Sequence, residues 1–402
     1  MTVVREVLSF LIENLAEREV LILLGARQVG KTFLMRELEN FLRLKKKKVK
    51  FFDLELPDHS RLFDRDKSEL YSFLTDDCDY LFIDEFQYFE NASKLFKAIY
   101  DDRRIDVKVI ASGSSSLDMH RHLKESLTGR KIEKIIRPLS FIEYSQQFND
   151  FEDYLVYGGY PGLLAKSKAA EKRDLLKQIL QTYVMKDIKG LVKEENISAF
   201  NNLLYHLAQA QKQVLPTATL ANELRVTEMT VEHYISILEQ TYIIYRIPSF
   251  SQNLSNELKK SKKYYFYDNG IRNAVINNFM RIKNREDKSS LYEAYVCHFL
   301  KNRLPSNGEL RFWRTKTGDE IDFILLINQE PTIFEVKSKL NSLEIPKSIK
   351  TFIKNYPKLK KAFILNENLE GEAYHLGFKV SFIKLKHLEH DPEILEIFED
   401  EF

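Results

Sequence analysis

Two short segments near the N-terminus carry residue types and spacings that suit phosphate chemistry. Residues 25–32 read Gly-Ala-Arg-Gln-Val-Gly-Lys-Thr and fit the pattern G-x-x-x-x-G-K-[ST] at every fixed position. The glycines let the backbone curl so that its N–H groups point at phosphates. Lys31 is expected to neutralise the β- and γ-phosphates, and the Thr32 hydroxyl to ligate Mg²⁺. The expected nucleotide contacts are Gly25, Ala26, Arg27, Gln28, Val29, Gly30, Lys31, Thr32 and Phe33.

The second segment, residues 80–85, is an apolar run that ends in two carboxylates, Asp84 and Glu85. Asp84 is expected to hold Mg²⁺ through water, and Glu85 to orient and deprotonate an attacking water molecule. A base aimed at water favours hydrolysis over transfer to a small substrate. ATP and Mg²⁺ are therefore the predicted cofactors. The alternative is that the two carboxylates are simply solvated at the end of a strand.

Two further positions are candidates for catalysis, each with a plainer alternative. An apolar run ends in Ser112 and Ser114, and a hydroxyl there would touch the γ-phosphate or the lytic water. We favour Ser114; an ordinary turn is the alternative. Arg130 precedes another apolar run, where an arginine can stabilise transition-state charge in a neighbouring subunit. That role requires a homo-oligomer, whereas an ordinary surface arginine does not.

The elements that must position these residues alternate between strand and helix patterns. Residues 33–44 have helical periodicity, and strands are predicted at 20–24, 49–56, 80–83, 107–111 and 131–139. Strands separated by helices imply a parallel sheet covered by helices on both faces. A strand before the loop and a helix after it form the setting that phosphate binding needs. The predicted fold class is α/β, of the P-loop NTPase kind.

Several longer motifs together resemble a known group. They are GARQVGKTFLMREL, YLFIDEFQ, VIASGSSSL, LTGR, RPLSFIEY and YGGYPGLL. In combination they are similar to the uncharacterised prokaryotic AAA-type ATPases that carry a C-terminal domain of unknown function, and the resemblance covers essentially the whole chain. In related P-loop switch ATPases a Gly-x-Pro element lies against adenine, so the resemblance implies a base contact for Pro161. Without the family, residues 158–162 indicate only a tight turn between helices.

The middle of the chain resembles a winged helix-turn-helix. Residues 215–238 have the pattern of helix, turn and helix, and aromatic residues within 241–250 predict a strand pair that would form the wing. The second helix of such a module often enters a DNA major groove. This helix carries Glu228, Glu232 and Glu239, which would repel phosphates. The better candidates for phosphate contact are Lys259, Lys260, Lys262 and Lys263. A purely packing role is the alternative.

The last part of the chain has acidic residues in a spacing that suits metal-assisted cleavage of a phosphodiester. Asp322 lies on one predicted strand, and Glu335 and Lys337 share a face of the next. With Glu293 from a preceding helix, they would hold a divalent metal and position a hydroxide. The set resembles the PD-(D/E)xK nuclease superfamily, which implies a restriction-endonuclease-like α/β domain that acts on DNA. Edge-strand charges kept for solubility are the alternative.

Changes of pattern divide the 402 residues into three predicted domains: a P-loop core at 1–145, a helical lid with winged helix at 146–285, and a nuclease-like domain at 286–402. Lys plus Arg is 61 and Asp plus Glu is 59, so any basic surface must be local. Two cysteines exclude a disulfide-stapled scaffold and a four-thiolate zinc site. No apolar run is long enough to cross a membrane, so we expect a cytoplasmic protein without a membrane partner.

The combined features predict a Mg²⁺-dependent AAA-type ATPase whose nucleotide state controls DNA binding or processing by the C-terminal domain. Nuclease activity is left open. The alternative is a nucleotide-gated switch in which the C-terminal domain is a non-catalytic interaction module.

Overall fold

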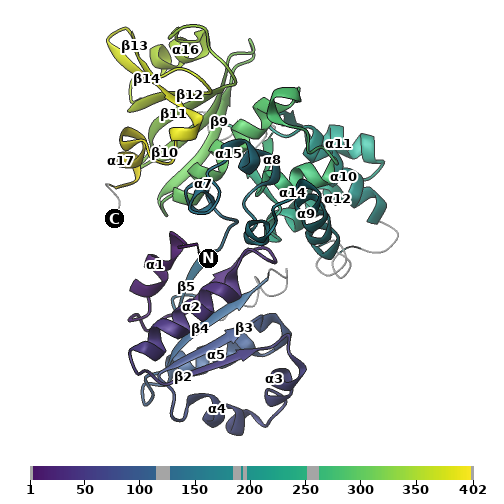
Figure 1. Cartoon of the computed structure of the whole chain (residues 1–402), viewed down its shortest axis with the longest axis vertical. Helices are drawn as coiled ribbons and strands as arrows, with labels where there is room; N and C mark the ends of the chain where they lie inside the picture. The colour runs from purple at the N-terminus through teal and green to yellow at the C-terminus, as the bar shows by residue number, and fades with distance from the viewer. Residues whose placement is uncertain (1–2, 115–126, 184–191, 193–196, 251–261, 400–402) are drawn as a thin grey trace.

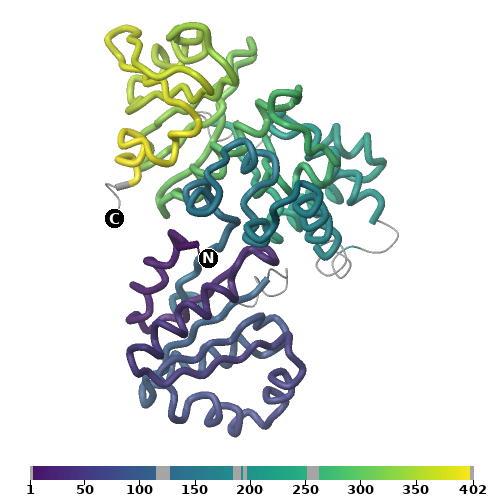
Figure 2. Tube along the Cα trace, in the orientation of Figure 1, coloured from purple at the N-terminus to yellow at the C-terminus, as the bar shows by residue number. Residues whose placement is uncertain are grey.

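The computed structural model describes residues 3–114, 127–183, 192, 197–250 and 262–399. Figures 1 and 2 show three units, with the N-terminal unit at one end of the long axis and the other two side by side at the opposite end. No helix in these described ranges is long and apolar enough to cross a lipid bilayer.

The N-terminal unit is a five-stranded parallel sheet with helices packed on it (Figure 1). The strand order is β2-β3-β4-β1-β5, so β4 lies between β1 and β3. The strands are β1 (Val20–Leu24), β2 (Val49–Asp53), β3 (Tyr80–Asp84), β4 (Lys108–Gly113) and β5 (Lys131–Ile135). The helices are α1 (Val7–Glu13), α2 (Lys31–Leu44), α3 (Pro57–Leu62), α4 (Lys67–Thr75), η1 (Phe86–Tyr88) and α5 (Ala92–Asp101). The predicted α/β class and parallel sheet are confirmed.

Two strands are shorter than predicted, for local reasons. β2 ends at Asp53 because its carboxylate accepts the Glu55 N–H at 3.0 Å and turns the chain towards α3. β5 ends at Ile135, shortly before Pro138, which has no N–H to give to a sheet. Ser140 then caps the next helix.

The middle unit is mainly helical with a small antiparallel sheet of order β6-β8-β7. Its helices are α7 (Phe141–Ser145), α8 (Phe151–Tyr157), η2 (Pro161–Ala165), α9 (Ala169–Tyr183), α10 (Ile197–Gln209), α11 (Thr217–Leu224), α12 (Glu228–Gln240), α14 (Asn269–Val275) and η5 (Ile282–Asn284). Its strands are β6 (Val214–Leu215), β7 (Ile244–Ile247) and β8 (Lys262–Phe266).

The predicted strand pair within residues 241–250 is wrong. That segment holds one strand, β7, and its partner is β8. Pro248 cannot donate to a sheet, and its carbonyl accepts the Phe312 N–H at 3.1 Å instead. The segment after β7 therefore runs on to the C-terminal unit rather than folding back on β7.

The C-terminal unit is a mixed six-stranded sheet of order β13-β14-β12-β11-β10-β9. Its strands are β9 (Gly308–Arg314), β10 (Glu320–Ile327), β11 (Glu330–Lys337), β12 (Lys361–Asn366), β13 (Gly371–His375) and β14 (Phe378–Lys384). Its helices are α15 (Lys288–Arg303), α16 (Lys347–Asn355), η6 (Leu385–His387) and α17 (Pro392–Glu399).

The middle and C-terminal units share one hydrophobic core. Helix α15 is buried on every side from Ser290 to Leu300, so it is the centre of this core rather than a surface helix. Tyr154 of α8, Tyr265 of β8 and Phe323 of β10 belong to the same buried cluster. Apolar packing, as well as charge pairing, therefore holds the middle and C-terminal units together.

Candidate functional site

The loop of residues 25–30 leaves the carboxyl end of β1 and enters α2 directly, as predicted. Gly25, Gln28 and Gly30 have φ angles of 152°, 62° and 95°. A Cβ added at Gly25 would lie 2.2 Å from the Ile136 carbonyl oxygen, so only glycine fits. A loop of this kind at a helix N-terminus presents backbone N–H groups to an anion.

Lys31 is buried with its ammonium group inside this loop. Its Nζ donates to the carbonyl oxygens of Gly25 at 3.1 Å and Ala26 at 3.0 Å. The same atom lies 4.0 Å from Oε1 of Glu85. One cation thus joins the loop after β1 to the carboxylate after β3.

Asp84 ends β3 and is 1% exposed. Its Oδ1 accepts the Ser112 hydroxyl, while its buried Oδ2 has no hydrogen-bond partner. Burial raises the pKa of Asp84, and the hydroxyls of Ser112 and Thr32 lower it. A buried carboxylate oxygen without a partner is costly. The pair Thr32 and Asp84 therefore fits a hard cation, because such cations take oxygen ligands.

Glu85 adopts a left-handed backbone conformation, with φ 52° and ψ 47°. This conformation is strained for a residue with a side chain. The Gln87 side-chain amide donates to Oε2 of Glu85 and, at 2.9 Å, to the hydroxyl of Ser114. Sequence analysis missed Gln87. Its only signal was its position two residues after Glu85.

The strand order explains why both serines reach this site. Because β4 lies between β1 and β3, its carboxyl end places Ser112 against Asp84 and Ser114 against Gln87. Arg130 lies at the opposite edge of the sheet: its carbonyl accepts the N–H of Val20, the first residue of β1. The structure does not bring Arg130 to the nucleotide loop of its own chain.

Arg130 forms an ordinary surface ion pair in the structure. Its Nε lies 2.8 Å from Oδ1 of Asp101, and both side chains are partly exposed. A catalytic role for Arg130 would therefore need a second copy of the chain.

A cavity of about 370 Å³ opens beside the loop. Its walls include Gly30, Phe33 and Pro161. A Cβ added at Gly30 would lie 3.7 Å from Pro161 Cγ, so the proline ring is packed against the loop. The structure thus places the Pro161 ring beside the loop of residues 25–30.

Arg5 supports the loop from the N-terminal segment, and sequence analysis missed it. Its Nη1 donates to the Val29 carbonyl at 3.0 Å, and its Nε pairs with Glu143 at 3.1 Å. Glu143 also closes a capping box with Ser140 at the start of α7. These contacts give the RPLSFIEY motif a structural role as the anchor of the loop.

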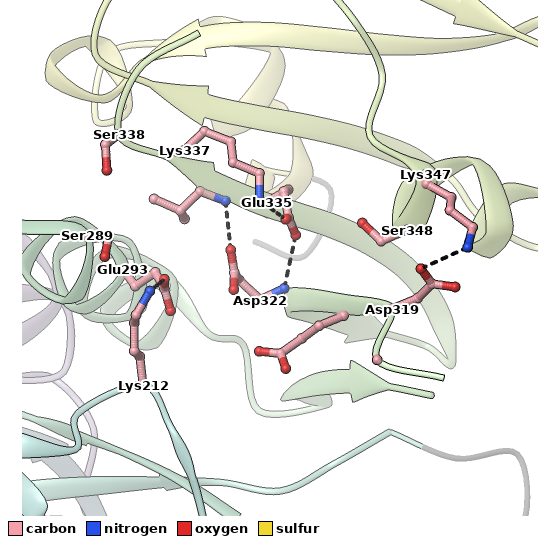
Figure 3. Close-up of a pocket in the computed structure, with 13 residues that line it drawn as sticks. Lys212, Ser289, Glu293, Asp319, Asp322, Glu335, Lys337, Ser338, Lys347 and Ser348 are labelled. Atoms are coloured by element: carbon pink, nitrogen blue, oxygen red, sulfur yellow. Dashed lines mark hydrogen bonds and ion pairs between the residues drawn. The ribbon is translucent and has the colours of Figure 1, made fainter. Parts of the chain in front are cut away.

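A second cavity, of about 530 Å³, lies where the middle and C-terminal units meet (Figure 3). Glu293 reaches it from α15, Asp322 from β10, and Glu335 and Lys337 from β11. The structure therefore brings together the residues predicted from the C-terminal motif. It adds Lys212 from the loop before β6, which sequence analysis did not single out.

One backbone and one side-chain hydrogen bond fix two carboxylates of this cavity. Oδ2 of Asp322 accepts the Val336 N–H at 2.9 Å, and Oε1 of Glu335 accepts from Lys337 Nζ at 2.6 Å. Burial and then the charge of Asp322 raise the pKa of Glu335 to about 8, although Lys337 lowers it. Burial and Asp322 likewise raise the pKa of Glu293 to about 7. Burial and the charge of Asp322 thus favour the protonated forms of both glutamates.

The expectation that Glu293, Asp322 and Glu335 together hold a metal does not fit this arrangement. Among the residues that the structure describes, no group of three or more His, Cys, Asp or Glu side chains is placed to hold a metal ion. Lys212 Nζ lies 2.9 Å from Glu293 Oε1, and Lys263 Nζ lies 3.7 Å from Asp322 Oδ1. With Lys337 on Glu335, ammonium groups already pair with all three carboxylates.

The prediction that Lys263 contacts phosphate on the surface is also wrong. Lys263 is 1% exposed and its Nζ lies 2.5 Å from Glu320 Oε1. Lys262 lies 3.5 Å from Glu232 of α12. Lys259 and Lys260 lie outside the described residues. Lys263 therefore forms buried ion pairs, whereas the pair that Lys262 forms is partly exposed.

In the comparison with known proteins, three successive segments of the chain match three different family models. Residues 17–145 match the family model described as an AAA domain. This match supports an AAA-type ATPase family. Residues 148–281 match a domain of unknown function (DUF8612), and residues 288–388 match another (DUF4143).

Curated relatives and solved structures add distant likenesses. An uncharacterized protein of Methanocaldococcus jannaschii is 26% identical, over 94% of this chain and 87% of its own. An uncharacterized protein of Haemophilus influenzae is 25% identical, over 49% of this chain and 52% of its own. AMPPCP-bound DnaA from Aquifex aeolicus has a TM-score of 0.31 at 18% identity, covering 58% of this chain and 86% of that one. Likenesses at such TM-scores do not bear on function.

Proposed function

We propose that the protein is a Mg²⁺-dependent ATPase of AAA type whose nucleotide state controls DNA binding or processing by the C-terminal unit. The observation that carries the proposal is the convergence on one sheet edge of Lys31, Glu85 and the unpartnered Oδ2 of Asp84. A cation, a base and a vacant carboxylate oxygen are the parts that phosphoryl transfer to water requires.

Each side chain has a distinct role in this proposal. Lys31 exchanges its bonds with the loop carbonyls for bonds with the β- and γ-phosphates. Thr32 and Asp84 hold Mg²⁺, which neutralises charge on the phosphates when bound. Glu85 takes a proton from the attacking water, and Ser114 orients that water or the γ-phosphate with help from Gln87.

The cavity beside the loop supports a place for the adenine ring. Pro161 and Phe33 offer apolar surface next to Gly30, at the point where a base would extend from the phosphates. Arg5, which also lines this cavity, donates to the loop carbonyl of Val29.

For the C-terminal unit, we propose that the cavity of Asp322, Glu335 and Lys337 serves DNA binding or processing. No metal-dependent step is assigned to it, because its carboxylates are paired with lysines. The same pairing favours the second candidate, a nucleotide-gated switch with a non-catalytic C-terminal module.

ATP turnover with and without Mg²⁺ and DNA tests the first proposal. We expect turnover that needs Mg²⁺ and is lost in Lys31→Ala, while Lys94→Ala, an exposed lysine of α5, keeps the wild-type rate. Stimulation by DNA favours processing, and slow turnover indifferent to DNA favours the switch. No turnover by the wild-type protein would contradict both.

Incubation of the protein with labelled single- and double-stranded DNA and Mg²⁺ or Mn²⁺ tests whether the C-terminal unit cleaves DNA. Cutting that disappears in Asp322→Ala would assign cleavage to this cavity. If the DNA is not cut while ATP is still hydrolysed, the result favours the second candidate, in which the C-terminal unit is a non-catalytic interaction module.

A further inference from the structure

The cavity beside the nucleotide loop combines apolar walls with polar side chains. Its volume is about 370 Å³, within the range of roughly 300–1,000 Å³ that is usual for sites of small ligands. Most of the lining is apolar and comes from Val3, Phe33, Leu139, Pro161, Leu164 and Ala165. Such walls suit the faces of a purine, and a few polar groups then decide which purine fits.

Phe33 provides an aromatic surface in this cavity. It lies in the first turn of α2, directly after Thr32, and its side chain is 41% exposed. Aromatic rings that are partly open in this way are suited to stacking against a base. Stacking does not distinguish adenine from guanine, because every base has a π-face. The choice between the two purines must therefore come from a hydrogen bond at the edge of the base.

Two of the described lining residues, Arg5 and Gln147, have polar side chains. Arg5 is 6% exposed and is directed into the protein, where it donates to the carbonyls of Val29 and Arg137 and pairs with Glu143. Gln147 is only half-buried. It is therefore the better placed of the two to meet the edge of a base.

A single hydrogen bond fixes the orientation of the Gln147 amide. Its Nε2 donates to the carbonyl of Leu164, near the end of η2, at 3.0 Å. A carbonyl oxygen only accepts, so the nitrogen of the amide must face Leu164 and the oxygen must face away from it. No described residue donates a hydrogen bond to this oxygen. The side chain thus offers an acceptor at the cavity.

The backbone around this amide is held at both ends. The Gln147 N–H donates to the Tyr144 carbonyl at 3.1 Å, which continues the turn of α7. Leu164 belongs to η2, the same short helix that begins with Pro161. The acceptor of Gln147 and the ring of Pro161 therefore keep a fixed relation to each other.

We propose that Gln147 selects adenine over guanine, its amide oxygen accepting from the 6-amino group of the base. This inference rests on the proposed ATP binding and names the purine that the site takes. Adenine carries an amino donor at the position where guanine carries a carbonyl oxygen. Guanine would therefore bring two acceptors together at Gln147.

The bond to Leu164 makes this selection strict. A free glutamine can turn its amide by 180° and offer its nitrogen to guanine instead. In this protein that turn would break the bond to Leu164 and place two carbonyl oxygens against each other. An unpaired polar group at a site built for a donor costs more than the bond itself contributes.

Competition between nucleotides measures the selection directly. ADP, GDP and purine riboside diphosphate, which is ADP without its 6-amino group, each displace a fluorescent, non-hydrolysable ATP analogue from the protein with Mg²⁺. We expect wild type to bind ADP about fivefold more tightly than purine riboside diphosphate and about tenfold or more tightly than GDP. This arm needs no variant.

Gln147→Met tests the residue itself, because methionine has a similar length but cannot accept from the amino group. We expect it to bind the three diphosphates with Kd values within about twofold of one another. Gln146→Met is the matched control. The Gln146 amide is exposed and bonds only to the backbone of Val4, at 2.8 Å in both directions. Its loss should leave the ratio of the ADP and GDP affinities as in wild type.

The outcomes separate this inference from the proposed function. If the fluorescent analogue does not bind wild type, ATP binding itself is contradicted. If wild type binds the analogue but does not prefer ADP to the other two diphosphates, adenine selection is overturned and nucleotide binding stands. If Gln147→Met keeps the wild-type ratios, the selection does not come from Gln147.

Discussion

At the scale of single residues, Asp268 makes the clearest prediction. It is a buried carboxylate that accepts the N–H groups of Gly159 and Ile271. Burial raises its pKa from 3.8 to about 6, although these hydrogen bonds lower it. Between these two pH values the folded protein binds more protons than the unfolded chain, so stability falls as pH rises through this window.

The Asp268→Asn variant cannot titrate and should lack this slope. Going from pH 4 to pH 6, the free energy of unfolding of wild type relative to the variant should fall by about 2 kcal/mol. Urea unfolding at a series of pH values measures it. A difference that is constant with pH would contradict the prediction.

Residues predicted to lie together are found together in the structure where they are neighbours in the chain. The loop of residues 25–32 and the pair Asp84 and Glu85 could be read because each is contiguous. Arg5 and Lys212 could not, because their partners are Glu143 and Glu293, far along the chain. Nothing near an isolated arginine or lysine reveals which distant carboxylate it will meet.

At the scale of elements, the joint between α8 and α14 depends on a glycine. A Cβ added at Gly270 would lie 1.9 Å from the Tyr157 carbonyl oxygen, so Gly270→Ala must push α14 away from α8. We expect a loss of about 2–4 kcal/mol in stability, seen as a lower Tm.

Gly162→Ala is the control for that substitution. Its added Cβ would meet only the end of the Leu175 side chain, at 3.1 Å, which can move. Equal melting temperatures for the two variants would mean that the α8–α14 contact is not tight.

Elements were predictable when periodicity and turn residues agreed, as for β1, β3 and α2. The partner of β7 was not, because β8 begins only at Lys262 and pairs through backbone groups that carry no sequence signal. The acidic character of α12 was correctly recognised, yet Glu232 and Glu239 both pair with Arg246 of β7, a contact no periodicity reveals.

At the scale of the whole molecule, one core crosses the boundary predicted between residues 285 and 286. Tyr154 and Tyr265 pack in the same cluster as Phe323 and Phe334. A chain that ends at residue 285 would expose this apolar surface and the unpaired Lys263. We expect it to lose cooperative unfolding and to be cut rapidly by protease, as followed by circular dichroism and limited proteolysis. A monomeric fragment with a cooperative melt would contradict the shared core.

In the proposed mechanism Glu85 activates water for ATP hydrolysis at the loop held by Lys31. The most direct test is ATP turnover by Glu85→Gln beside wild type, with binding of a fluorescent ATP analogue measured on both. We expect unchanged binding and turnover reduced by about 100-fold or more, the usual contribution of a general base. A Glu85→Gln protein that hydrolyses ATP at the wild-type rate would contradict it.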